Sequence, residues 1–179
     1  MLKPAWKVLT ASGRSLEDPL LGTAVVVLTV ALVGVVISEV AAVVGLVTLL
    51  AVDGPWGHPL ADPAWDPASS LILAFLALTV IGGGIGKVLA IIGTVAEREP
   101  FAPANAARIE SLGWRVIELA VIGWVAASLE VPVGGTVAGH HVAVELQGGN
   151  ALAFALVLFV LARVFRHGNR MAQDLEGTV

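Results

Sequence analysis

The sequence predicts an all-helical integral membrane protein, a four-helix transmembrane bundle with two outer loops, formed by the whole chain as a single domain. Apolar residues make up 57% of the 179 residues and charged residues only 13%, whereas about a quarter of the residues of a soluble domain are charged. Several apolar runs are too long for core helices, which indicates membrane spans. The ten Lys and Arg residues also avoid every second connection between these runs, as in multi-pass membrane proteins.

The first predicted span covers residues 20–38, a run rich in Val and Leu that carries no charge. The apolar character continues beyond it, and one helix reaching Val52 would be about 50 Å long, too long for a single span without strong tilt. We therefore expect a break near Glu39 or Gly45, or alternatively a strand over residues 46–52.

Residues 39–70 form the first predicted outer loop, in which the proline and glycine density of DGPWGHPLADPAWDPASS permits no helix. The second predicted span covers residues 71–95 and contains the stretch IGGGIGKVLAIIG. Gly82 and Gly86 have GxxxG spacing and Gly93 continues the small-residue face, so a neighbouring helix can approach this face closely.

This glycine-rich stretch does not match a phosphate-binding loop, because Ile81 stands where the motif needs its first Gly and Val88 where it needs Ser or Thr. Lys87 is the deepest cation of the second span. Its side chain either snorkels to the nearer interface or is a functional buried charge, and snorkelling is the interpretation we favour.

A polar connection over residues 96–111 leads into the third predicted span, 112–130. Arg115 and Glu118 lie three residues apart near its start. This spacing places them on one helical face, so we expect an intramembrane ion pair that lowers the cost of entering the bilayer.

The second outer loop covers residues 131–149, where the alternating segment HVAVEL fits a short strand. The fourth predicted span covers residues 150–166, and Arg163 and Arg166 can snorkel to its interface. A polar helical tail follows.

The distribution of charge predicts the orientation of the chain. The N-terminal tail, the central connection with the adjoining span ends and the C-terminal end hold ten cations and eight carboxylates, a charge of +2, whereas the other two loops hold six carboxylates, a charge of −6. The positive-inside rule then places both termini in the cytoplasm.

The outer loops hold the weak candidates for metal ligands, His58, His140, His141 and Asp62. Imidazole and carboxylate groups suit Zn²⁺, and histidine titrates near neutral pH. Their spacing matches no metal motif, however, so we expect solvated loops and neither metal nor cofactor. The chain has no cysteine, no nucleophile elbow and no HExxH, and we therefore expect no enzymatic activity.

Two polar stretches, EREPFAPANAARIESLGW in the centre and FVLARVFRHGNRMAQDLEGTV at the end, resemble the signatures of a bacterial family of small four-span membrane proteins of unknown function. The central signature combines a Pro-Phe pair, an Asn, an Arg and a Gly before the third span, and the terminal one combines Val-Phe, a Gly and an acidic close ending in Thr-Val. The matching positions, about a quarter of the chain, are Pro100, Phe101, Asn105, Arg108, Ile109, Leu112, Gly113, Leu161, Val164, Phe165, Gly168, Asp174, Glu176, Thr178 and Val179.

Members of this family are often encoded beside small helix-turn-helix regulators of the Cro type. The resemblance therefore implies a protein of the bacterial cytoplasmic membrane that is the partner of a DNA-binding protein and does not itself contact nucleic acid. We expect a regulatory or scaffold role, with a partner surface formed by Pro100, Phe101, Asn105, Arg108, Arg166 and Arg170. In a simpler interpretation, Pro100 and Phe101 only turn the chain and cover the bundle end.

Two alternative functions remain open at this point. One is a small transporter or permease subunit that uses the glycine-rich second span, and the other is an ion or pH sensor on the outer face. Besides the lipid bilayer, a second copy of the chain packed on the glycine face is a further expected partner.

Overall fold

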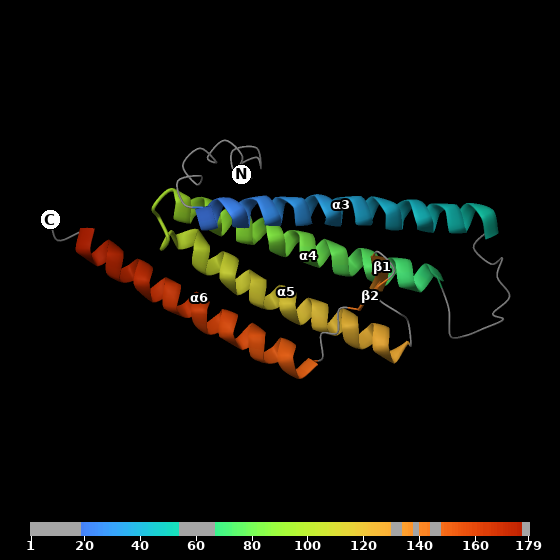
Figure 1. Ribbon diagram of the computed structural model, residues 1–179. Helices are drawn as coiled ribbons and strands as arrows, with labels where there is room; N and C mark the ends of the chain where they lie inside the picture. The colour runs from blue at the N-terminus through green and yellow to red at the C-terminus, as the bar shows by residue number, and fades with distance from the viewer. Residues whose placement is uncertain (1–18, 54–66, 130–133, 138–139, 144–147, 177–179) are drawn as a thin grey trace.

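The computed structural model describes residues 19–53, 67–129, 134–137, 140–143 and 148–176. Within this part of the chain the fold has four helices and one short hairpin (Figure 1). The elements are α3 (Pro19–Asp53), α4 (Pro67–Ala96), α5 (Pro103–Ser128), β1 (Gly134–Val137), β2 (His140–Ala143) and α6 (Gly148–Glu176).

The first helix, α3, is continuous over 35 residues. The expected break near Glu39 or Gly45 is therefore wrong, and so is the alternative strand over residues 46–52. Its one proline, Pro19, is the first residue of the helix, so no proline removes a backbone donor from the interior. A Cβ added at Gly45 would lie 3.5 Å from the side chain of Leu71, so a contact with α4 supports the helix where its own side chain is missing.

Hydroxyl side chains in α3 are satisfied within the helix itself. Thr29 donates to the carbonyl of Val25 at 2.7 Å, and Ser38 donates to the carbonyl of Gly34 at 2.9 Å. Such bonds to the preceding turn leave no free donor on the surface of an apolar helix. The Thr and Ser side chains of α3 are thus compatible with an apolar surrounding.

Three of the described helices are long and apolar enough to cross a membrane, over Pro19–Ala51, Ala68–Ala96 and Asn150–Met171. The chain is therefore a helical protein with the features of a membrane protein. α5 is not among the three, and it carries four charged side chains, Arg108, Glu110, Arg115 and Glu118.

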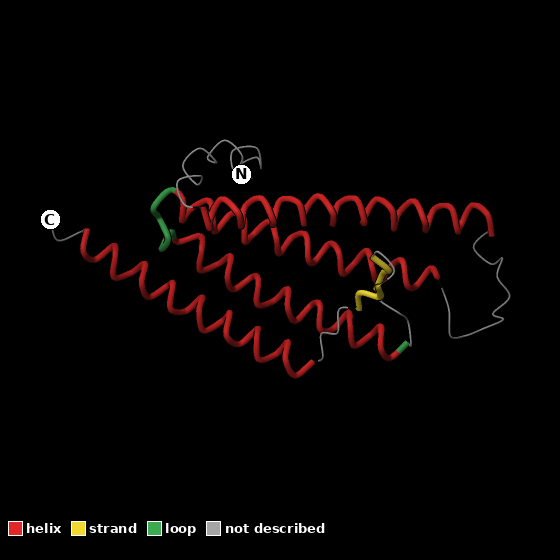
Figure 2. The backbone as a smooth tube through the Cα atoms, in the orientation of Figure 1, coloured by secondary structure: helices red, strands yellow, loops and turns green. Residues whose placement is uncertain are grey.

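The four helices lie side by side in a row, in the order α3, α4, α5, α6 (Figures 1 and 2). Each packs chiefly on its neighbours in sequence, with α3 and α6 at the two edges. Successive helices run in opposite directions. One end of the row, which we name the turn end, thus holds the start of α3, residues 97–102 and the end of α6.

The buried side chains are few and small. Of nine buried apolar residues in the described part, six are alanines, so the helices approach closely and do not enclose a core of large side chains. Large apolar side chains such as Val30, Trp124 and Leu156 are instead exposed, at 67%, 71% and 64%. An exterior of this kind suits lipid as its surrounding.

The hairpin follows α5. β1 and β2 pair antiparallel, with Gly134 opposite Ala143 and Val137 opposite His140. The second strand includes the start of the HVAVEL segment for which the alternation predicts a strand.

Candidate functional site

The turn end is built first by the way in which α4 stops. The amide of Glu99 donates to the carbonyl of Thr94 at 2.9 Å, and the amide of Arg98 donates to that of Val95 at 3.0 Å. These two bonds form a Schellman motif, whose C′ residue adopts the left-handed conformation. Here that residue is Arg98, with φ of 63°, where most helices use glycine.

Asn105 then ties this turn to both helices. Its side chain is fully buried, with 0% exposure. The amide nitrogen donates to the hydroxyl of Thr94 at 2.7 Å and to the carbonyl of Pro100 at 3.0 Å, while the amide oxygen accepts from Arg108 at 2.7 Å. One side chain thus joins the end of α4, the turn and the first turns of α5.

Arg108 extends the same network along α4. Besides Asn105, its Nη1 donates to the carbonyl of Ala90 at 3.1 Å. Asn105 is buried and Arg108 is half-buried and bound within the chain, so the expectation that both belong to a partner surface is wrong for Asn105 and does not describe the contacts of Arg108. The hydrogen bonds of Asn105 and Arg108 show that these two residues stabilise the turn between α4 and α5.

Phe101 brings the central polar connection and the end of the chain together. Its ring centroid lies 5.6 Å from that of Phe165 on α6, and a Cβ added at Gly168 would lie 3.1 Å from its ring. The glycine therefore makes room for the phenylalanine of the turn. Phe101 still remains 47% exposed, so it covers the end of α6 and also faces outward.

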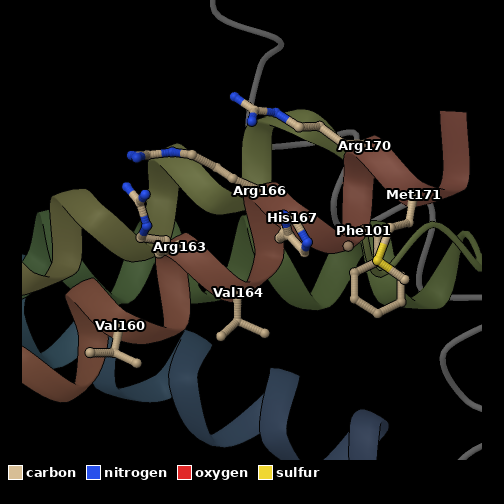
Figure 3. Close-up of a pocket in the computed structure, with 9 residues that line it drawn as sticks. Phe101, Val160, Arg163, Val164, Arg166, His167, Arg170 and Met171 are labelled. Atoms are coloured by element: carbon tan, nitrogen blue, oxygen red, sulfur yellow. The ribbon is translucent and has the colours of Figure 1, made fainter. Parts of the chain in front are cut away.

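A groove of about 800 Å³ opens beside Phe101 along the outer side of α6. Figure 3 shows the side chains of Arg163, Arg166 and Arg170 projecting on one flank, with Val160 and Val164 on the other. Further lining residues are Phe101, His167, Gly168 and Met171. Arg166 also forms an ion pair with Glu110 of α5. The groove combines an apolar floor with a cationic rim.

One turn deeper, α5 and α6 meet through rings and a glycine. Trp114 and Phe159 lie edge to face at 5.5 Å. A Cβ added at Gly113 would lie 2.8 Å from the Phe159 ring, a contact that only a glycine permits.

Arg115 lies against α4 and does not pair with Glu118. Its Nη1 donates to the carbonyl of Val80 at 3.0 Å and to that of Thr79 at 3.5 Å. A Cβ added at Gly83 would lie 2.6 Å from the guanidinium. The sequence signal for this contact was the Gly-Gly-Gly run at 82–84, for which the pattern predicts packing against a helix backbone and not against an arginine.

The three glycines expected to pack a neighbouring helix have different surroundings. A Cβ at Gly82 would lie 3.1 Å from Val35 of α3, whereas Gly86 and Gly93 have open space around the Cβ position. Gly82 therefore serves the α3–α4 contact. Lys87 is half-buried in the same helix.

The candidate metal ligands of the two predicted outer loops are not assembled in the described part of the chain, where no group of three His, Asp or Glu residues could hold a metal ion. His140 and His141 are adjacent in β2. His58 and Asp62 lie outside the described residues.

Comparison with known proteins finds no matching family model, no matching curated protein and no matching solved structure. The chemistry of the turn end and its groove is therefore the basis for a functional proposal. An exposed aromatic ring with several guanidinium groups beside it is suited to binding a partner.

Proposed function

We propose that the chain is an integral membrane protein whose turn end docks a cytoplasmic protein. The observation that carries the proposal is the groove beside Phe101, where an exposed ring adjoins the exposed arginines of α6. Interfaces are enriched in aromatic residues and arginine, and a few such residues supply most of the binding energy. The protein then acts as a membrane-bound regulator or scaffold.

In the proposed topology all four helices cross the membrane, including α5, which is not apolar enough to be recognised as a membrane span from its composition alone. Its position between α4 and α6 supports this, because both neighbours pack along it and remove much of its polar face from lipid. With both termini in the cytoplasm, the turn end lies on the cytoplasmic side, in accordance with the positive-inside rule. The membrane is then the bacterial cytoplasmic membrane.

The proposed docking surface consists of exposed residues of the turn end, namely Pro100, Phe101, Arg163, Arg166 and Arg170. Its chemistry fits a segment that inserts an apolar side chain beside Phe101 and presents carboxylates to the arginines. A small helix-turn-helix regulator is the proposed partner, in keeping with the family that the two stretches resemble.

The test is capture of a small helix-turn-helix regulator, identified among the genes that neighbour this one, by the protein purified with its native lipids. We expect Phe101→Ala and Arg170→Glu each to lower recovery of the regulator about tenfold or more, the effect typical of an interface anchor. Val157→Ala is the matched control, because Val157 is exposed on α6 and does not line the groove. Equal recovery by all four proteins would reject the docking surface.

A further inference from the structure

The α4–α5 face carries a charge near the middle of an apolar helix. The apolar stretch of α4 covers 29 residues, Ala68–Ala96, and its centre is close to Gly82. Arg115 binds the carbonyls of Thr79 and Val80, which lie within one turn of that centre, about 5 Å along the axis. If α4 crosses the membrane as proposed, the guanidinium lies near the bilayer midplane, where a cation is costly without partners.

Only part of the hydrogen-bonding capacity of this guanidinium is satisfied within the described residues. Arginine has five N–H donors. Within the described part of the chain, Nη1 alone donates, to the two carbonyls of α4. No carboxylate in this part forms an ion pair with Arg115, since the ion pair found there joins Arg166 and Glu110.

Glu118, three residues beyond Arg115 on the same face of α5, presents the complementary charge. It is exposed, between Trp114 and Val121, which are also exposed at 56% and 53%. It lies one turn beyond Arg115, about 4.5 Å further along α5. In a single copy this carboxylate faces lipid without an ion pair among the described residues.

α4 carries small exposed residues close to Arg115. Thr79, whose carbonyl accepts from Arg115, and Gly86 are both exposed, and a Cβ added at Gly86 would have no neighbour within 4 Å. Small residues allow the backbones of two membrane helices to approach closely. The surface therefore combines the exposed Gly86 of α4 with two charged side chains of α5. The Arg115 guanidinium is only partly satisfied, and the Glu118 carboxylate has no ion pair among the described residues.

We propose that this surface binds a second copy of the chain, and that Arg115 of each copy pairs with Glu118 of the other. A two-fold axis along the membrane normal keeps both copies in the same orientation and makes the two ion pairs equivalent. It also brings Arg115 and Glu118 of opposite copies to depths that differ by only about one turn, within reach of their long side chains. The inference rests on the proposed membrane topology but not on the docking groove, which is a different surface.

The absence of cysteine from the chain permits a direct test by single-cysteine cross-linking of the purified protein in lipid vesicles. Val121→Cys places a thiol on the proposed surface. Val157→Cys on α6 and Val33→Cys on α3 are matched controls, since both valines are exposed elsewhere. We expect a disulfide-linked product of two copies for Val121→Cys and only collisional levels for the controls; equal cross-linking of all three overturns the proposal.

The charge pairing is tested by adding Glu118→Gln to the Val121→Cys protein, with helicity measured to verify folding. We expect a three- to tenfold decrease in cross-linking, corresponding to the strength of polar contacts between membrane helices. Exchange of the two charges, Arg115→Glu with Glu118→Arg, should restore part of it. Unchanged cross-linking in the Glu118→Gln protein overturns the pairing. Regulator capture by the same variants separates this inference from the docking proposal, because only the docking proposal requires the groove.

Discussion

α5 packs on two neighbours by different means. Toward α4 it presents Asn105, Arg108 and Arg115, which form hydrogen bonds with side chains and backbone carbonyls along that helix. Toward α6 it presents Gly113 and Trp114, which meet the ring of Phe159. The polar side is directional and fixes the register of α5 on α4, whereas the aromatic side depends on shape and on the absence of a Cβ.

The two sides also differ in what they require from their surroundings. A hydrogen bond can be replaced by water only where water is present, so the polar side loses most when a partner is removed in a dry interior. The aromatic side loses packing and can partly relax. The polar side should therefore be the more sensitive to single substitutions.

The largest effect is expected for Asn105→Leu, which removes all three partners of a fully buried side chain. Arg108 then loses an acceptor and the Pro100 carbonyl loses a donor, so the free energy of unfolding should fall by about 3 kcal/mol. The measurement is unfolding by SDS titration in mixed micelles, followed by circular dichroism.

Asn105→Asp provides the matched comparison. The carboxylate still accepts from Arg108 but cannot donate to Thr94 or Pro100, so its loss of stability should be smaller than that of Asn105→Leu. A Leu variant as stable as the native protein would show that the network does not support the fold.

The second effect concerns Arg115 of α5, where it packs against α4. Gly83→Ala displaces the Arg115 guanidinium, because the added Cβ would lie 2.6 Å from it. The lost charge-assisted bonds exceed the gain in helix propensity, and we expect a net loss of about 1–2 kcal/mol. Gly93→Ala on the same helix is the control, since its Cβ meets open space, and it should be neutral or stabilising in the same SDS titration. Equal behaviour of the two variants would contradict the proposed role of Gly83.

The third effect tests the aromatic side. In Gly113→Ala the new methyl group presses on the Phe159 ring, 2.8 Å away, and overpacking of this kind costs about 1–2 kcal/mol. Gly123→Ala on the same helix has open space and serves as the control. Thermal unfolding of both variants in detergent gives the comparison, and an unchanged Gly113→Ala midpoint would mean that α6 moves away at no cost.

These contacts show where sequence reasoning succeeded and where it did not. Long apolar runs predict helices well, because composition alone decides whether a segment suits lipid. Both ends of α4 lie close to those of the predicted span, and α6 begins close to its own but continues to Glu176, through the predicted helical tail. The continuity of α3 was missed, because the break was predicted from the thickness of a bilayer. Whether a helix continues depends instead on its local conformation and on its contact with Leu71.

The partners of single polar side chains were harder to predict. Arg115 and Glu118 have the spacing of an ion pair, yet Arg115 binds α4, because a gap left by Gly83 on another helix offers two carbonyls at once. Asn105 has the appearance of a surface residue in the sequence and is the most buried side chain among the described residues. Such contacts depend on which helix lies opposite, and a single sequence does not specify this. The joining of Phe101 to Phe165 follows from helix order, since both lie at the turn end.

The smallest expected effect concerns Arg98, in the turn that leads into the polar side of α5. Arg98 adopts a left-handed conformation, with φ of 63°, which is strained for a residue with a Cβ and free of strain for glycine. Arg98→Gly should therefore raise stability by up to about 1 kcal/mol, even though it loosens the unfolded chain, which opposes part of the gain. Arg98→Ala, which removes the charge but keeps the Cβ, should give no such gain. If the two variants unfold at the same SDS fraction, the benefit comes from charge and not from the backbone, and the turn does not limit the stability of the polar side of α5.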